Sequence, residues 1–249
     1  MEVHAHSHTP RKKWTHYFWE FLMLFLAVLC GFFAEYQLEH TIEKQRSKVY
    51  ATNLYDELKK DTAELNRVIT ELEFNAKKLD TLCYLVTKNG IRSIQSQQLL
   101  RISRYVTHIS FFSSNNSTIE ELKGSGGLRL LKPNVSRQIS LYDKELKDLE
   151  NEYALTKAEF IRMEELYFKV IDRSLFENLF KDQALFDKDS LIKNADPIIN
   201  DDPKLVKEFL GWVAFEKGIY REQIKNFLLP LKEEASKLLT LLKKEYHPE

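Results

Sequence analysis

Residues 21–34 form an apolar run, FLMLFLAVLCGFFA, without a charged or strongly polar side chain. A basic cluster, Arg11 to Lys13, precedes the run, and most of the 249 residues follow it. The run is about 14 residues long, a length at which a buried helix, a signal-peptide core and a membrane span are all expected. The residues that flank the run therefore decide between these three readings.

Aromatic side chains flank the run on both sides: Trp14, Tyr17, Phe18 and Trp19 before it and Tyr36 after it. Rings of this kind gather at membrane–water interfaces. The segment 14–36 has about 23 residues, or ~34 Å of helix, enough to cross a bilayer. The run is also apolar on every face, unlike a surface helix. The sequence therefore predicts a transmembrane helix over residues 14–36.

A cleaved signal peptide is the main alternative, because its layout is also a basic stretch before an apolar core. A cut after Ala34 would place Phe32 where a small residue is needed. A lipoprotein-type cut before Cys30 would follow Leu29, which is not small either. We therefore interpret the segment as an uncleaved signal anchor.

The charges beside the anchor predict its orientation. Arg11 to Lys13 lie at its amino-terminal side, whereas Glu35 and Glu39 open the other side, which has no basic residue before Lys44. Positive charges favour the cytoplasmic side, so the amino terminus is expected in the cytoplasm and everything from about residue 37 outside it. The predicted parts are a short cytoplasmic, His-rich basic tail (1–13), the signal anchor (14–36) and an extracytoplasmic helical bundle (37–249).

Glu20 is the acidic residue closest to the hydrocarbon, and a carboxylate inside a membrane marks a functional site by default. His16 lies four residues earlier on the same helical face, and Lys13 lies seven residues earlier. Glu20 can therefore pair near the interface, and we expect no transport role for it.

Heptad spacing beyond the anchor predicts a long helix that packs along one stripe. Leucine or valine recurs every seven residues, at Leu58, Leu65, Leu72, Leu79 and Val86, and a second seam holds Leu54, Val68 and Leu82. Asp61 and Asn75 interrupt the second seam, where polar residues often specify register. No Gly or Pro falls between Gly31 and Gly90, so anchor and stalk are expected to form one helix that ends at Asn89-Gly90.

Three further segments are expected between residues 93 and 170. A second helix is predicted over 93–112, and a short helix follows from Ser117 to Gly124, where Ser117 and Glu120 have capping-box spacing. Glycines at 124, 126 and 127 could form a phosphate-binding loop, but neither nucleotide-binding fingerprint surrounds them. We therefore predict a tight turn between helices. After Pro133, a denser heptad pattern predicts a core-facing helix of about forty residues. Its seam is Val135, Ile139, Tyr142, Leu146, Leu149, Tyr153, Thr156, Phe160, Met163, Tyr167 and Val170.

The last helix is expected after a linker over residues 187–202, with Asp202 as its cap and Pro203 as its first residue. Pro230 predicts a kink. Gly211 and Gly218 lie on one face, and we attribute them to close approach of another helix. Together these patterns predict an all-α protein: a transmembrane helix that continues into an antiparallel, coiled-coil-like bundle of long helices.

The residue inventory argues against catalysis. Of seven histidines, only His108 lies within the helical domain proper, and Cys83 is the domain's only cysteine. Glu-x-x-His and His-Glu-x-x-His motifs are absent, so we expect neither a di-iron nor a zincin centre, no cofactor and no enzyme. The sequence pattern does not exclude a pair of carboxylates that would hydrolyse a glycosidic bond. We interpret the many acids on the amphipathic helices as residues of solvent-facing surfaces. Basic and acidic residues both total 37, which disfavours nucleic acid as a partner.

His4, His6 and His8 are the one metal-site candidate, because neutral imidazoles on a tail can ligate zinc, nickel or copper. With no fourth ligand designated, the site would be weak and open.

Three stretches resemble one known family: Trp19 to Glu35 of the anchor, LYDELKKDT at 54–62 and STIEELKGSGGLRLL at 117–131. They are similar to an uncharacterised single-span helical envelope protein family of the Bacteroidota, a domain of unknown function. The resemblance implies an inner-membrane protein with an extracytoplasmic helical domain. It carries over no activity and no functional residues.

Two functions fit these expectations. One is a membrane-anchored scaffold or interaction protein of the cell envelope, a homo-oligomer or bound to another envelope protein. The other is a ligand-sensing bundle that signals through a partner, because about thirteen residues before the anchor are too few to fold as an output domain. A polar cavity near Tyr142, Tyr153 and His108 would favour the sensor, and an exposed apolar stripe from Leu58 to Val86 would favour assembly.

Overall fold

The computed structural model describes residues 14–172, 174 and 196–248. Within these residues the protein is all-α, and its β pairing is confined to an isolated bridge between Ile171 and Ile198. The chain divides into two compact units, one up to Tyr50 and one from Ala51 onward, and each is described by itself. The predicted fold class, an apolar amino-terminal helix and a bundle of long helices, is confirmed.

The first unit is the start of α1 (Trp14–Asn89), the helix that holds the apolar run. This helix is long and apolar enough to cross a membrane, and its most apolar window is not buried against the rest of the protein. Trp14 is 83% exposed, and Leu24 and Phe32 are each 69% exposed. His16 Nε2 lies 3.0 Å from a carboxylate oxygen of Glu20, as the spacing of the two residues predicts.

The predicted continuous helix is also confirmed, because α1 has no break before Asn89. Gly90 follows with a φ of 77°, a left-handed value that a side chain would disfavour. The part of α1 from Ala51 onward, which carries the heptad repeat, belongs to the second unit.

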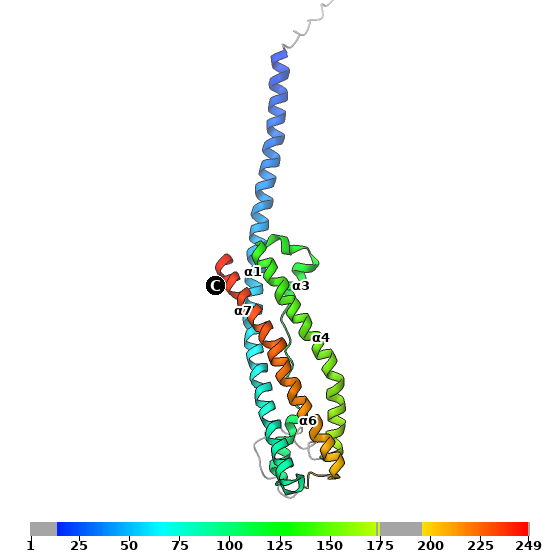
Figure 1. The fold of residues 1–249 in the computed structure, drawn as a ribbon. Helices are drawn as coiled ribbons and strands as arrows, with labels where there is room; N and C mark the ends of the chain where they lie inside the picture. Colours follow the sequence, from blue (N-terminus) through cyan, green and yellow to red (C-terminus); the bar gives the residue numbers. More distant parts are fainter. Residues whose placement is uncertain (1–13, 173, 175–195, 249) are drawn as a thin grey trace, which may run out of the picture. The chain divides into compact units, whose positions relative to one another are not determined.

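Three long helical segments build the second unit (Figure 1): α1 from Ala51 onward, α4 (Pro133–Val170), and α6 (Pro203–Gln223) with α7 (Leu229–Tyr246). The chain runs antiparallel in α4 and α6–α7, since Gln138 bonds to Glu234 near one end of α4 and Thr156 bonds to Gln223 further along it. Lys217 and Arg221 on α6 both bind the Asp80 carboxylate on α1, at 2.7 and 2.8 Å.

The core of this unit lies where the three segments meet. The stripe Leu58 to Val86 is inside it, with Leu65, Leu72 and Leu79 at 0% exposure. The α4 seam is largely buried too: Val135, Tyr142, Met163 and Tyr167 are fully covered, although Tyr153 and Phe160 keep some exposure. The other helices of the chain therefore cover the apolar stripe of α1, which is not available as an exposed assembly surface.

The predicted helix over 93–112 is wrong in its second half. The chain forms a 3-10 turn η1 (Ile91–Ser93), the helix α2 (Ser96–Ser103) and a second 3-10 turn η2 (Arg104–Val106). Residues 107–116 are then extended, without regular secondary structure. Their backbone and side chains bond to α1 instead of closing helical turns.

The short helix predicted at Ser117 exists as α3 (Ser117–Gly124), but its capping box does not form. The Glu57 carboxylate of α1 accepts hydrogen bonds from Thr118 N at 3.2 Å and from Thr118 Oγ1 at 2.9 Å. A distant acid therefore occupies the positive end of α3 and replaces the local cap. The expected glycine turn follows, with Gly126 at a φ of 69°, and leads into η3 (Gly127–Leu130).

The start of the last helix is as predicted, because the Asp202 side chain accepts hydrogen bonds from Lys204 N and Leu205 N. Most of the predicted linker over 187–202 lies outside the described residues. Pro230 follows a π-helical turn, η5 (Ile224–Leu228), which joins α6 to α7. A π turn is one way for a helix to accommodate a residue that lacks an N–H donor.

The interpretation of Gly211 and Gly218 is wrong. A Cβ atom added at either glycine would meet no heavy atom within 4 Å. No described helix packs closely against this face of α6, so the two glycines leave an open surface.

Candidate functional sites

A ladder of polar side chains on α1 holds the extended segment 107–116. Asn75 Nδ2 donates to the His108 carbonyl at 3.0 Å, and Glu71 accepts from Ser110 Oγ. Asp61 binds Ser114 and Asn115 further along the segment. The segment therefore runs antiparallel to α1, and the polar residues that interrupt the heptad seam hold it in place.

Asp61 is the most enclosed member of this ladder, with 1% of its surface exposed. Its carboxylate accepts from Ser114 Oγ at 3.0 Å, from Asn115 N at 2.9 Å, from Asn115 Nδ2 at 2.8 Å and from Tyr142 OH at 2.8 Å. Burial, and then the Asp61 charge, raise the pKa of Tyr142, which keeps this phenol a donor. Asp61 thus connects α1, α4 and the extended segment, and its bonds serve the fold.

The residues expected to line an internal ligand cavity form hydrogen bonds with other parts of the fold. Tyr153 OH accepts from Phe112 N at 3.0 Å, and burial raises the pKa of Tyr153 to about 12. The His108 carbonyl accepts from Asn75 and from Tyr220 OH, the latter at 3.4 Å, while the His108 side chain is exposed. Tyr142, Tyr153 and His108 therefore do not converge on one ligand site.

Glu216 is a buried acid in the bundle that the sequence analysis did not single out. It lies on α6, is 4% exposed and is hydrogen-bonded to Tyr220. Burial, with a smaller contribution from the nearby Glu159 charge, raises the pKa of Glu216 to about 7. Glu216 occupies a position where it holds a proton more readily than a solvated acid does.

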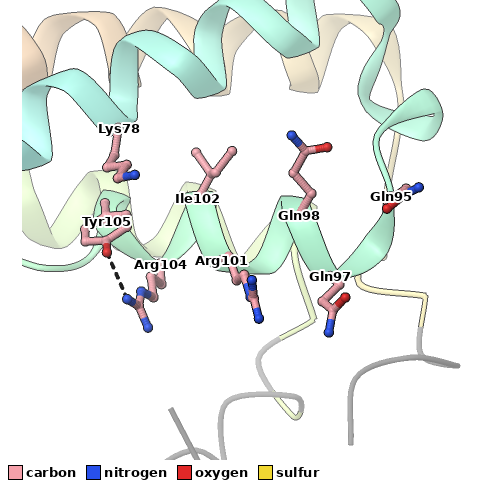
Figure 2. Close-up of a pocket in the computed structure, with 8 residues that line it drawn as sticks. All are labelled: Lys78, Gln95, Gln97, Gln98, Arg101, Ile102, Arg104 and Tyr105. Atoms are coloured by element: carbon pink, nitrogen blue, oxygen red, sulfur yellow. Dashed lines mark hydrogen bonds between the residues drawn. The ribbon is translucent and has the colours of Figure 1, made fainter. Parts of the chain in front are cut away.

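A cavity of about 680 Å³ lies between α1 and the α2–η2 segment (Figure 2). Its lining combines three cationic residues, three glutamines, an aliphatic and an aromatic side chain: Lys78, Arg101, Arg104, Gln95, Gln97, Gln98, Ile102 and Tyr105. In Figure 2 the basic end holds Lys78, Arg104 and Tyr105, and the glutamines gather at the other end. Among the described residues, the lining contains cations and amide donors but no acid, a combination that suits a carboxylate or phosphate group.

Arg104 is held in place at this cavity. Its Nη2 donates to Tyr105 OH at 2.8 Å, and its guanidinium lies 4.9 Å from the centre of the Tyr105 ring. The Tyr105 ring in turn meets Phe74 edge to face at 5.5 Å. Sequence reasoning missed this cavity because Lys78 is far from Arg101 and Arg104 along the chain. The only local signal was the pair of arginines three residues apart.

The predicted metal ligands His4, His6 and His8 lie outside the described residues. Within the described residues, no group of three or more His, Cys, Asp or Glu side chains is placed to hold a metal ion. Cys83 is a partly buried free thiol, and burial raises its pKa.

Comparisons with known proteins add no relative. No protein-family model, no curated protein and no solved structure matches this chain.

Proposed function

We propose that this protein is a membrane-anchored scaffold or interaction protein of a bacterial cell envelope and has no catalytic activity. The observation that carries the proposal is α1 itself. One unbroken helix holds an exposed apolar segment suited to lipid and then supplies the central stripe of a folded domain. Because anchor and core share a helix, the domain stays attached to the membrane unless the chain is cleaved.

The proposed location is the inner membrane, crossed once, with the amino terminus in the cytoplasm and the helical domain in the periplasm. The basic cluster Arg11 to Lys13 and the acids Glu35 and Glu39 support this orientation. The resemblance to the Bacteroidota envelope family supports the same location.

Partner contacts are proposed on the outer faces of the domain, because the α1 stripe is internal. Exposed apolar side chains on α4 offer such a face: Leu155 is 72% exposed and Ile161 48%. Either a second copy or another envelope protein would cover them.

Site-specific photo-cross-linking in native membranes tests this proposal. A benzophenone amino acid at Leu155 or Ile161 should give the same cross-linked partner, and one at the exposed Asp56 of α1 should not. Recovery of only the monomer from both apolar positions would refute the scaffold function. Carbonate extraction of the same membranes tests whether the protein is integral.

The second candidate is a ligand-sensing bundle that signals through a partner, and the cation-lined cavity in Figure 2 is the observation that favours it. Calorimetric titration of the full chain with inorganic phosphate and with citrate tests it. A saturable signal that Lys78→Gln weakens would support sensing, and no signal with either anion would count against it.

Metal binding by His4, His6 and His8 is a weaker alternative. Deletion of residues 2–9 should abolish zinc or nickel binding by the full chain. Unchanged binding after the deletion would eliminate the tail as the metal site.

A further inference from the structure

A second cavity lies on the outer surface between α4 and α6, away from the residues of Figure 2. Its volume is about 340 Å³, and Glu159, Glu208, Gly211, Trp212 and Phe215 line it. Glu159 comes from α4, and the other four lie along α6. The volume is at the lower end of the range of small-molecule sites, ~300–1,000 Å³.

Two aromatic rings form the apolar part of this cavity. The rings of Trp212 and Phe215 meet edge to face, with centroids 5.7 Å apart and planes at 89°. Phe215 is 49% exposed and Trp212 is partly exposed, so both rings remain accessible to a ligand. The faces of aromatic rings carry negative electrostatic potential and attract cations.

Gly211 keeps the cavity open. A Cβ atom at this position would meet no heavy atom within 4 Å, so a larger side chain there would extend into unoccupied space. Gly218 is equally open but does not line the cavity. The two glycines therefore form a matched pair, of which only Gly211 belongs to the cavity.

Negative charge surrounds the aromatic pair. Among the described residues, no Lys, Arg or His forms an ion pair with Glu159 or Glu208 at the cavity. The Glu159 charge also acts on a further acid of α4: after burial, the Glu159 and Glu222 charges raise the pKa of Glu152. A bound cation would relieve this repulsion.

We propose that this cavity binds a small organic ammonium cation, of the trimethylammonium type. The aromatic faces would contact the methyl groups, and the Glu159 and Glu208 carboxylates would balance the charge. A bare metal ion would not use the aromatic lining, and an anion would meet unpaired acids. The inference is independent of the scaffold proposal and of the cation-lined cavity.

Trp212 provides the measurement, because the chain has 3 tryptophans and the other two, Trp14 and Trp19, lie in the apolar anchor segment. Full-length protein carrying Trp14→Phe and Trp19→Phe is titrated in dodecyl maltoside with choline. The control ligand is 3,3-dimethylbutan-1-ol, the uncharged carbon isostere of choline. A saturable change in fluorescence with choline, at a Kd on the order of 1 mM, and none with the isostere is the expected result.

Three variants in this background locate the site. Gly211→Leu should abolish the choline response, and Gly218→Leu should leave it unchanged. Glu159→Gln should weaken binding about fivefold, the effect of removing one partly exposed charge. Circular dichroism of each variant confirms that the bundle is folded.

The ammonium group could come from a free solute or from a lipid headgroup, and nanodiscs separate these sources. A Trp212 signal that differs between phosphatidylcholine and phosphatidylglycerol discs, and is lost in Gly211→Leu, identifies a headgroup. A signal that appears only with added choline identifies a free cation. An absent choline response in both detergent and nanodiscs, an equal response to the isostere, or equal responses from Gly211→Leu and Gly218→Leu would each overturn the proposal.

Discussion

Replacing Asp61 with Leu should destabilise the domain by about 3–4 kcal/mol. The carboxylate accepts four hydrogen bonds at 2.8–3.0 Å and is 1% exposed. Leu branches at Cγ as Asp does and carries two larger methyl groups in place of the two oxygens, so the change removes both acceptors and leaves no cavity. Asn115 N and Tyr142 OH would be left without their partner, at about 1–3 kcal/mol each. Ser114 and the Asn115 amide are nearer the surface and can turn toward water, while removal of a buried charge offsets part of the loss.

A double-mutant cycle with Tyr142→Phe isolates the part of this energy that belongs to one bond. Tyr142→Phe alone removes one donor to a charged acceptor, worth about 1.5–3 kcal/mol. In the Asp61→Leu background the same change should cost about 1–2 kcal/mol less, because the phenol has already lost its acceptor. Asp56→Leu is the control, since Asp56 is exposed on the same helix and should change stability by less than about 0.5 kcal/mol.

Urea unfolding of the full chain in dodecyl maltoside measures these effects. Far-ultraviolet circular dichroism follows the unfolding, and so does the fluorescence of Trp212 in chains that carry Trp14→Phe and Trp19→Phe. Amide hydrogen exchange gives an independent signal, because the Asn115 N–H should lose its protection in Asp61→Leu. The reasoning is refuted if Asp61→Leu is as stable as Asp56→Leu, or if Asp61→Leu and Tyr142→Phe add without coupling.

Three further predictions follow from the structure. Because the pKa of Glu216 is raised from an ordinary 4.5 to about 7, its protonated form stabilises the fold fully below pH 4.5, and this contribution is lost as the pH rises through 7. Glu216→Gln should therefore gain stability relative to the parent between these pH values, on the order of 3 kcal/mol, and parallel pH profiles in urea unfolding would contradict this. Leu72→Ala should cost about 2–5 kcal/mol at every protein concentration, and Phe74→Ala, at an exposed position, should cost far less; a concentration-dependent midpoint would instead indicate that the stripe packs between chains. For the proposed orientation, a cysteine at the exposed Lys88, in a chain with both native cysteines replaced by Ser, should react with a membrane-impermeant maleimide in intact spheroplasts, and labelling only after lysis would reverse the orientation.

Local pattern was enough to predict most helices of this protein. Heptad spacing placed Leu58 to Val86 on one stripe, Gly90 marked the end of α1, and Asp202 with Pro203 marked the start of α6. These signals work because apolar periodicity, caps and backbone freedom act within a few residues along the chain.

The extended segment 107–116 could not be predicted in this way. Its backbone bonds depend on acceptors and donors such as Asp61, which lies 54 residues before Asn115. The tertiary contacts therefore outweigh the local helical pattern of residues 93–112. Lys78 of α1 meets Arg101 of α2 and Arg104 of η2 at one cavity for the same reason, and Glu159 meets the aromatic rings of α6 at the other.

The sequence by itself determined the all-α class, the apolar segment suited to a membrane and the unbroken path of α1, because each depends on composition and spacing along one helix. Only the tertiary structure decided that the α1 stripe faces inward, that Asp61 and Asn75 hold an extended segment, and that Gly211 borders an open cavity. Those features arise where side chains distant in sequence meet, and their partners are defined only once the helices have packed.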